Sequence, residues 1–187
     1  MKKIITLYGQ PGCGKSTQAQ ILAEKYGFFQ FGMGERLREE IESGSSLGKE
    51  IKPFVDEGTL IPDNLMIQVI RNISDKATES GIIFDGFPRI VAQAEMLEKL
   101  AGEMGLEIGK LYYLRLKPEE ALRRINARAK LGKRKDDVSP EAIKNRFATF
   151  ERESKPLLEH YRNRGKLIEI DGEMSINETQ AEIIKNL

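Results

Sequence analysis

Short apolar segments alternate along the chain with longer segments in which apolar and polar positions recur at helical spacing. The short segments are rich in β-branched and aromatic residues and end at Gly, Asp or Pro, which is typical of buried strands. Alternation of such strands with helices predicts an α/β fold with a five-stranded parallel sheet flanked by helices. The expected strands cover residues 3–8, 28–31, 82–84, 111–116 and 167–170. The expected helices cover residues 15–26, 34–43, 47–57, 63–79, 90–101, 118–130, 140–164 and 177–186.

Two segments interrupt this alternation. About fifty residues separate the second expected strand from the third, and their pattern is that of three helices rather than one crossover. Open α/β sheets bind ligands at the carboxyl ends of their strands, so the excess predicts an inserted helical flap over that edge. Residues 131–139 combine Gly with charged neighbours and have no apolar anchor, which predicts a surface segment.

Composition narrows the class of protein. Apolar residues make up 40% of the 187 residues and charged residues 32%, the balance of a globular protein. Lys and Arg total 30 against 29 for Asp and Glu, so neither nucleic acid nor a membrane is an expected partner. Nine of the 13 arginines lie between Arg115 and Arg164, which predicts that an anion site draws on that stretch.

Cysteine usage and apolar runs bear on location. Cys13 is the only cysteine, so no internal disulfide can form, in agreement with a reducing compartment. The apolar run of residues 4–8 stops at Gly9, too short for a signal peptide, and no run approaches the length that spans a bilayer. We therefore expect a cytoplasmic protein. The size of the chain and its lack of an obvious apolar face favour a monomer.

Residues 9–16 read Gly-Gln-Pro-Gly-Cys-Gly-Lys-Ser and match the phosphate-loop pattern G-x-x-x-x-G-K-[ST]. The glycines let backbone N–H groups converge on phosphate oxygens, and the helix that follows presents its N-terminus to the same anion. Lys15 would add a charge at the β- and γ-phosphates, and a hydroxyl could reach Mg²⁺. A chance Gly-rich turn is the alternative, but it would not require a strand before the loop and a helix after it. The loop predicts a nucleotide site without specifying the reaction.

A second motif begins where an apolar run ends at Asp85. In phosphate-loop proteins such a carboxylate orients Mg²⁺ or its waters, whereas a strand-end Asp before Gly can also be only a turn former. Residues 86–89 read Gly-Phe-Pro-Arg and Gln93 follows, which favours the first interpretation. With these residues the chain resembles the adenylate kinase family of nucleoside monophosphate kinases, in its short-lid form.

The resemblance runs nearly end to end. It is most specific at the D-G-F-P-R-x-x-x-Q pattern of residues 85–93. The other matching segments are the phosphate loop with residues 9–18, the G-D-x-L-R-like residues 34–38, the flap-like residues 43–49 and 58–63, the lid-like residues 134–137 with Arg146, and residues 170–172 beside the ATP base. The resemblance implies a phosphate-loop NTPase fold and reversible phosphoryl transfer from Mg·ATP to AMP, giving two ADP.

The family's functional residues can be carried to matching positions. On the ATP side, Lys15 would hold the phosphates and Arg124 would lie against adenine, with further residues at Gly12, Cys13, Gly14, Ser16, Thr17, Arg128, Gly172 and Met174. On the AMP side, Arg38 and Arg89 would clamp the phosphate and Gln93 would bind the base, with further residues at Met33, Leu60, Ile61, Gly86, Arg134 and Arg146. The implied catalytic residues are Lys15, Arg89, Arg128, Arg134 and Arg146. Ser16 and Asp85 would hold Mg²⁺ through its water shell.

This set of cations also has a physical rationale. Phosphoryl transfer develops charge on equatorial oxygens, so positioned cations can carry most of the catalysis, and the planar fork of arginine suits that role. No histidine nucleophile is needed, and the single histidine, His160, is expected on the surface of a helix. Five other arginines are expected to be solvated charges paired with glutamates such as Glu119 or Glu159; they are Arg115, Arg123, Arg152, Arg162 and Arg164.

The chain departs from the family pattern in three places. Ser16 stands where the family usually has Gly, which suggests that this hydroxyl shares in metal binding. Gly32 and Met33 replace a common Ser-Thr pair, and Glu35 replaces Asp. Because these residues are expected near the monophosphate base, a UMP/CMP kinase or a broader nucleoside monophosphate kinase stays an alternative. The short lid lacks the four zinc-binding cysteines of longer lids, and no zinc is expected.

The expected organisation is one domain in three parts. The core comprises residues 1–31, 62–130 and 138–187, the monophosphate-binding flap residues 32–61, and the lid residues 131–137. A phosphate-loop switch or motor would carry a guanine-reading segment or an acidic residue after Asp85, where Gly86 stands. A catalytically silent module would lack the phosphate arginines, which are present.

Overall fold

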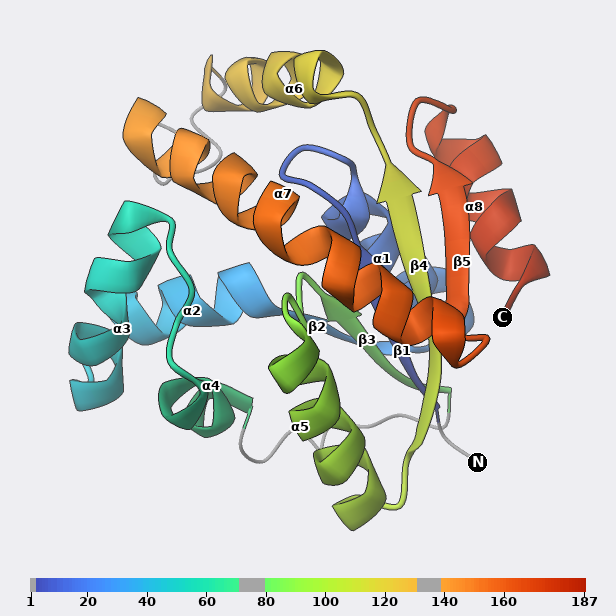
Figure 1. Ribbon diagram of the computed structural model, residues 1–187, viewed down its shortest axis with the longest axis horizontal. Coiled ribbons are helices and arrows are strands. Elements are labelled where there is room, and N and C mark those ends of the chain that lie inside the picture. The colour runs from blue at the N-terminus through green and yellow to red at the C-terminus, as the bar shows by residue number, and fades with distance from the viewer. Residues whose placement is uncertain (1–2, 71–79, 131–138) are drawn as a thin grey trace.

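The centre of the molecule is a five-stranded parallel sheet (Figure 1). The computed structural model describes residues 3–70, 80–130 and 139–187. The strands follow the spatial order β2-β3-β1-β4-β5. Their bounds are β1 Lys3–Tyr8, β2 Phe29–Gly32, β3 Gly81–Asp85, β4 Glu107–Arg115 and β5 Leu167–Asp171. The predicted α/β class and parallel five-stranded sheet are confirmed.

Helices connect the strands and extend beyond them. Their bounds are α1 Lys15–Tyr26, α2 Met33–Glu42, α3 Ser46–Glu57, α4 Asp63–Ile70, α5 Val91–Glu103, α6 Pro118–Lys130, α7 Pro140–Asn163 and α8 Ile176–Lys185. The helices at 15–26 and 118–130 have the predicted bounds, and most others differ at their ends by one or two residues. Of the predicted helix over residues 63–79, residues 71–79 lie outside the described residues.

One strand is longer than its apolar run. β4 begins at Glu107, four residues before the expected start at Leu111. The added residues pair with β1, since Glu107 is opposite Lys3 and Ile108 is opposite Ile4. Gly109 and Lys110 interrupt the apolar pattern, and the register shifts at this point. Pairing with a central strand thus overrides the weak local preference.

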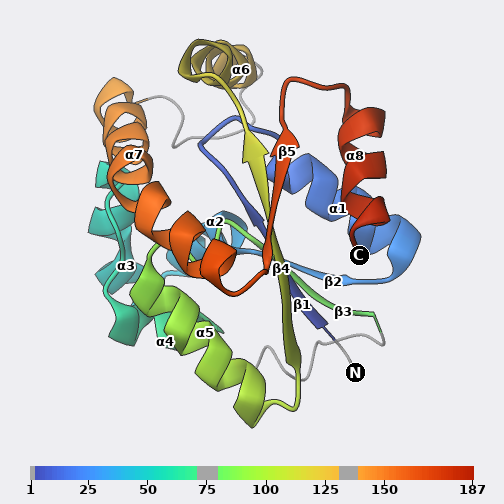
Figure 2. The same ribbon diagram turned by 45° about the vertical axis from the view of Figure 1, so that its right-hand side comes forward.

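Both faces of the sheet are buried under helices. Ile5 and Leu7 of β1 belong to one apolar cluster together with residues of α1 and α8. Ile4 faces the opposite way and packs among residues that include Leu97 of α5. Figure 2 shows α1 and α8 on one side of the sheet and α5 and α7 on the other. This is why the central strands are apolar at successive positions rather than at alternate ones.

The segment between β2 and α4 forms a pair of packed helices, α2 and α3, which stands to one side of the sheet in Figure 1. Gly48 of α3 lies so close to the backbone of Glu40 in α2 that a side chain has no room there. At the end of the pair, Asn145 Nδ2 of α7 donates a hydrogen bond to Glu57 O at 2.8 Å. The helix pair therefore contacts the first half of α7.

The expectation for His160 is wrong. The side chain is 6% exposed, and its Nε2 lies 3.3 Å from Glu98 Oε1 of α5. It lies on α7 where that helix packs on α5, and its ring meets the ring of Tyr161 edge-on. The sequence of α7 does not reveal which of its polar residues a neighbouring helix will cover. The position of His160 in the middle of a polar helix therefore favoured the surface.

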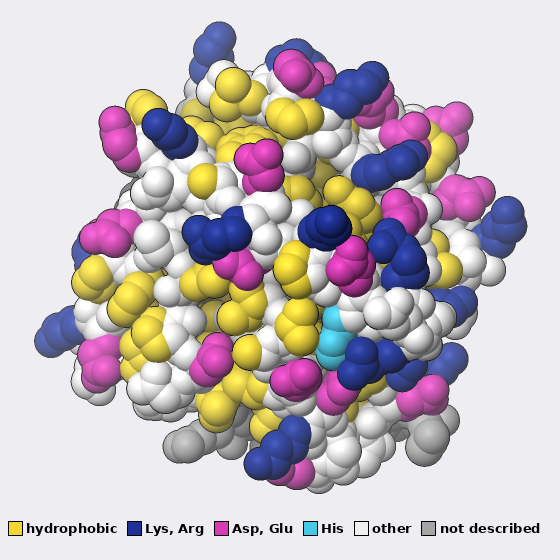
Figure 3. Space-filling view, in the orientation of Figure 1, with side chains coloured by type: hydrophobic (Ala, Val, Ile, Leu, Met, Phe, Trp, Pro, Cys, Tyr) yellow, Lys and Arg dark blue, Asp and Glu magenta, His cyan; other side chains and the backbone are white. Residues whose placement is uncertain are grey.

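The surface carries mixed charges. On the face shown in Figure 3, acidic and basic side chains are interspersed with apolar ones. Within the part of the chain that the structure describes, no helix is long and apolar enough to cross a bilayer.

Candidate active site

A cavity of about 1030 Å³ opens at the carboxyl edge of the sheet. Its walls come from the loop after β1, the loop after β3, α2, α6, α7 and the segment between β5 and α8. α6 lies across this edge at the top of Figure 1, above the loop that follows β1. The volume lies at the upper end of the range for small-molecule sites, which is expected if two ligands share it.

The loop after β1 depends on a glycine conformation and on hydrogen bonds from Lys15. Gly12 has φ +86, and a Cβ at this position would lie 2.7 Å from Ala121 O of α6, so glycine is required. Lys15 Nζ donates to Gly9 O at 2.9 Å and to Gln10 O at 3.1 Å. The ammonium group therefore lies inside the loop and in the wall of the cavity.

Asp85 lies next to this loop because of strand pairing. It is the last residue of β3, opposite Leu7 of β1 on one side and Gly32 of β2 on the other. The residue is 8% exposed and lines the cavity. Ser16, which carries a hydroxyl at the start of α1, lines it too. A carboxylate and a hydroxyl from different elements thus line the same cavity as the phosphate loop.

Arg89 is fixed by its own loop. Its Nε donates to Gly86 O at 3.0 Å, and its backbone N–H donates to Gln93 Oε1 at 2.9 Å. Burial, and then the positive charge of Arg146, lower the pKa of Arg89. Two guanidinium groups that repel each other at one cavity are suited to bind an anion between them.

Four further arginines line the same cavity from three helices. Arg38 comes from α2, Arg124 and Arg128 from α6, and Arg146 from α7. Together with Lys15 and Arg89 they outnumber the acidic side chains of the described wall, Glu35, Asp85 and Glu153, so the cavity is cationic on balance. Three arginines of the arginine-rich stretch, Arg124, Arg128 and Arg146, thus line this cavity, and binding of an anion by them stays a prediction.

The far end of the cavity lies between α6 and the segment after β5. Gly172 donates its backbone N–H to Arg115 O at 2.6 Å and would not accommodate a Cβ there. Met174 and Ile176 follow, and Ile176 is 55% exposed although it is apolar. Arg124 of α6 lines the other wall, so this end of the cavity combines a planar guanidinium group with apolar side chains. An aromatic base can stack on such a surface.

A family model described as adenylate kinase matches residues 7–166. This chain belongs to the adenylate kinase family. The protein named adenylate kinase in Azobacteroides pseudotrichonymphae is 38% identical over 184 residues, which cover 98% of this chain and 96% of that protein. The adenylate kinase of Bacteroides thetaiotaomicron is 40% identical over 90% of this chain and 89% of its own length. The adenylate kinase of Leptospira biflexa is 37% identical over the full length of both chains.

Most residues expected at the site of an adenylate kinase line the cavity. They are Gly12, Cys13, Gly14, Lys15, Ser16, Thr17, Arg38, Asp85, Gly86, Arg89, Arg124, Arg128, Arg146, Gly172 and Met174. Their roles toward each nucleotide stay predictions. Residues 131–137, which were expected to form the lid and include Arg134, lie outside the described residues.

Four residues expected around the AMP base are not in the cavity wall. Met33 and Ile61 are buried in the apolar core, and Leu60 is half-buried beside Ile61. Gln93 is fully buried behind Arg89, and its Nε2 has no hydrogen-bond partner in the described part of the chain. A buried amide without an acceptor is rare, and this one lies one helical turn from Arg89.

The cavity wall also contains residues that the motifs did not identify. Tyr8 was counted only as a strand residue, yet it lies in the wall, and its ring packs against that of Phe150 in a tilted arrangement at a centroid distance of 5.5 Å. Burial and the neighbouring Tyr113 raise the pKa of Tyr8, so its phenol stays neutral. Glu153 of α7 also reaches the wall. Its spacing of seven residues from Arg146, two helical turns, was the available signal.

Proposed function

We propose that this chain is an adenylate kinase that transfers the γ-phosphoryl group of Mg·ATP to AMP and forms two ADP. The observation that carries the proposal is the meeting of a complete phosphate loop, a strand-end Asp85 and five arginines at one cavity. Membership of the adenylate kinase family points to the same reaction.

ATP would occupy the side of the cavity formed by α1, α6 and the segment after β5. Its phosphates would lie in the loop, where Lys15 and the N-terminus of α1 offer positive charge. Its base would lie toward Arg124 and Met174. This places the γ-phosphoryl group at the centre of the cavity, toward Arg128 and Arg146.

AMP would occupy the side formed by α2 and the loop after β3. Arg38 and Arg89 would bind its phosphate, and Nε2 of Gln93 is a donor available for its base once the residues around it adjust. The helix pair α2–α3 would act as the monophosphate flap, and residues 131–137 as the lid. Closure of both would exclude water from the transfer, which protects ATP from hydrolysis.

Transfer then needs no covalent intermediate on the protein. The arginines hold two mutually repelling phosphate chains in line, and their charges stabilise the transition state in a site shielded from water. Each guanidinium keeps its proton throughout, because arginine is not deprotonated in proteins. The chain's contribution is therefore positioning and charge.

The donors beside the phosphate loop fit Mg²⁺. Within the described ranges 3–70, 80–130 and 139–187, no group of three or more His, Cys, Asp or Glu side chains could form a closed metal site. Asp85 and Ser16 offer one carboxylate and one hydroxyl oxygen, and Mg²⁺ characteristically takes one or two such ligands and completes its shell with water and substrate phosphates. When bound, the ion would neutralise charge on the β- and γ-phosphates.

The proposal is tested by measuring ADP formation from Mg·ATP with AMP, CMP, UMP or GMP as acceptor. The proposed function predicts that turnover is highest with AMP. It also predicts two ADP for each AMP consumed, against one ADP for each molecule of the other acceptors. Preference for CMP or UMP would identify the alternative, a UMP/CMP kinase. Absence of ADP with every acceptor would refute both. A monomer in the cytoplasm stays a prediction, which gel filtration and fractionation would test.

A further inference from the structure

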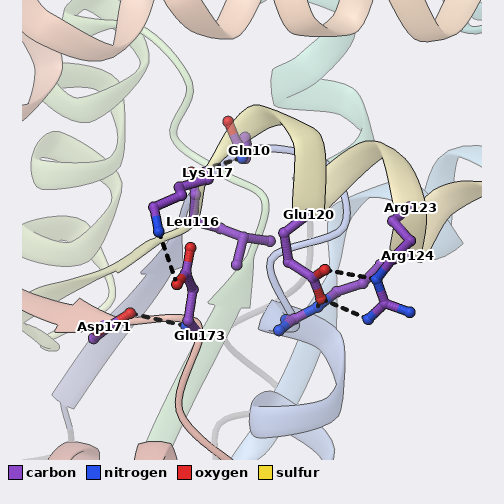
Figure 4. A network of polar contacts seen from close by, with 8 residues as sticks. All are labelled: Gln10, Leu116, Lys117, Glu120, Arg123, Arg124, Asp171 and Glu173. Carbon is purple, nitrogen blue, oxygen red and sulfur yellow. Dashed lines mark hydrogen bonds and ion pairs between the residues drawn. The ribbon is translucent and has the colours of Figure 1, made fainter.

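A second hollow, of about 490 Å³, lies on the other side of Arg124 from the nucleotide cavity. Arg124 lines both, so its side chain forms part of the partition between them. All the other residues that line it in the described part of the chain are charged, among them Glu120 and Arg123 of α6 and Glu173 of the segment after β5. Figure 4 shows this network.

Glu120 lies at the centre of the contacts on α6. Its Oε1 accepts a hydrogen bond from Arg124 Nε at 2.7 Å. Both of its oxygens also accept from Arg123, at 2.6 Å from Nε and 2.8 Å from Nη2. One carboxylate therefore contacts two guanidinium groups that are neighbours in sequence (Figure 4), and of these two only Arg124 lines the nucleotide cavity.

The two arginines differ in exposure. Arg123 is 71% exposed, whereas Arg124 is 31% exposed. A long side chain that is partly exposed samples many rotamers unless a partner holds it. A hydrogen bond at Nε lies in the plane of the guanidinium group, so it sets that plane and leaves the flat faces available for stacking.

We propose that Glu120 is a positioning residue, whose carboxylate fixes the guanidinium plane of Arg124 at the base end of the cavity and thereby raises the affinity for the donor nucleotide. This inference rests on the proposed function, in which the base of ATP lies against Arg124. Hydrogen bonds from Arg123 and then from Arg124 lower the pKa of Glu120 to about 2, so its charge is constant over the pH range of any assay.

Further contacts hold the backbone at the start of α6 and the segment after β5, which also line the second hollow. Lys117 Nζ, at the approach to α6, lies 3.3 Å from Glu173 Oε2, and the backbone N–H of Glu173 donates to Asp171 Oδ1 at 2.9 Å (Figure 4). Gln10 Nε2 of the phosphate loop donates to Leu116 O at 2.8 Å. The backbone on which Arg124 sits is thus tied independently of Glu120, so removal of Glu120 should free the side chain rather than move the helix.

The test compares Glu120→Ala, Glu120→Gln, Arg124→Ala and the double variant Glu120→Ala/Arg124→Ala with the wild type. We expect Glu120→Ala to raise the KM for ATP about fivefold, with kcat and the KM for AMP within about twofold. Glu120→Gln keeps an acceptor oxygen and should recover part of the loss. The double variant should equal Arg124→Ala, because Glu120 acts only through Arg124.

The matched control is Arg123→Ala, which removes a partner of the same carboxylate on the solvent side. It should leave the KM for ATP within about 1.5-fold of the wild type. Calorimetric titration of ATP and thermal unfolding of each variant separate loss of affinity from loss of fold. An unchanged KM for ATP in Glu120→Ala, or additive effects in the double variant, would overturn the inference. If the wild type itself forms no ADP, the proposed function fails first; if it does, these outcomes concern Glu120 alone.

Discussion

Removal of Arg89 is the perturbation whose consequence the structure defines best. Arg89 is held by its Nε bond to Gly86 O and by the bond from its backbone N–H to Gln93, so its guanidinium reaches the cavity in one orientation. A phosphate bound by the terminal nitrogens of this fork gains two charge-assisted hydrogen bonds, each contributing about 1.5–3 kcal/mol. Part of this is offset, because Arg89→Ala also relieves repulsion with Arg146.

We therefore take the lower limit, about 3 kcal/mol, which corresponds to a loss of roughly a hundredfold in kcat/KM for AMP. The loss should appear chiefly as a raised KM for AMP, while the affinity for ATP is retained. Arg89→Lys keeps a charge but not the fork and should fall between the wild type and Arg89→Ala. The assay is initial-rate ADP formation with AMP varied at saturating Mg·ATP.

The control is Arg162→Ala, an arginine that is 52% exposed and pairs with Glu169 away from the cavity. Arg162→Ala should change neither the KM for ATP nor the KM for AMP by more than about twofold. Normal AMP saturation in Arg89→Ala would show that this residue does not bind the acceptor phosphate, and the assignment of the two sides of the cavity would have to be abandoned.

Three further predictions concern the metal, the helix pair and a buried phenol. Ser16→Gly should raise the Mg²⁺ concentration for half-maximal turnover about fivefold if the hydroxyl contacts the ion; an unchanged Mg²⁺ dependence would remove Ser16 from the metal site. Gly48→Ala should lower stability by about 1–3 kcal/mol, because its Cβ would collide with the backbone of Glu40, and a thermal midpoint equal to that of the wild type would contradict this close packing. Burial raises the pKa of Tyr112 to about 12, from the ordinary value of 10. The stability that its neutral phenol contributes is therefore fully present below pH 10 and is lost as the pH rises through 12. Tyr112→Phe should therefore lose less stability than the wild type between pH 10 and 12 in urea unfolding, and parallel curves would count against this reasoning.

Local patterns predicted the elements that form the phosphate loop and its surroundings. The strand before the loop, the loop and α1 follow from an apolar run, spaced glycines and Lys15, and each of these signals is contained within a short stretch of sequence. Asp85 and Arg89 were found in the same way, from a strand end and the motif after it. The structure adds that Asp85 reaches the loop because β3 pairs with β1.

Features that depend on packing between distant segments could not be predicted. The early start of β4 requires pairing with β1, and burial of His160 requires α5 to lie against α7. Tyr8 read as a core residue because a pattern of apolar positions does not show that a strand ends at a cavity. The contacts of Glu120 could have been predicted, since its spacing from Arg123 and Arg124 is that of neighbours on a helix. Three charged residues on one helix, however, usually indicate only a solvated face.

The central claim is that one cavity holds both nucleotides at once and passes the phosphoryl group directly between them. Initial rates measured with ATP and AMP varied together test it most directly. The account predicts lines that intersect in a double-reciprocal plot, because no product can leave before both substrates are bound. Parallel lines, with ADP released from ATP before AMP binds, would indicate a phosphorylated protein intermediate and would contradict the account.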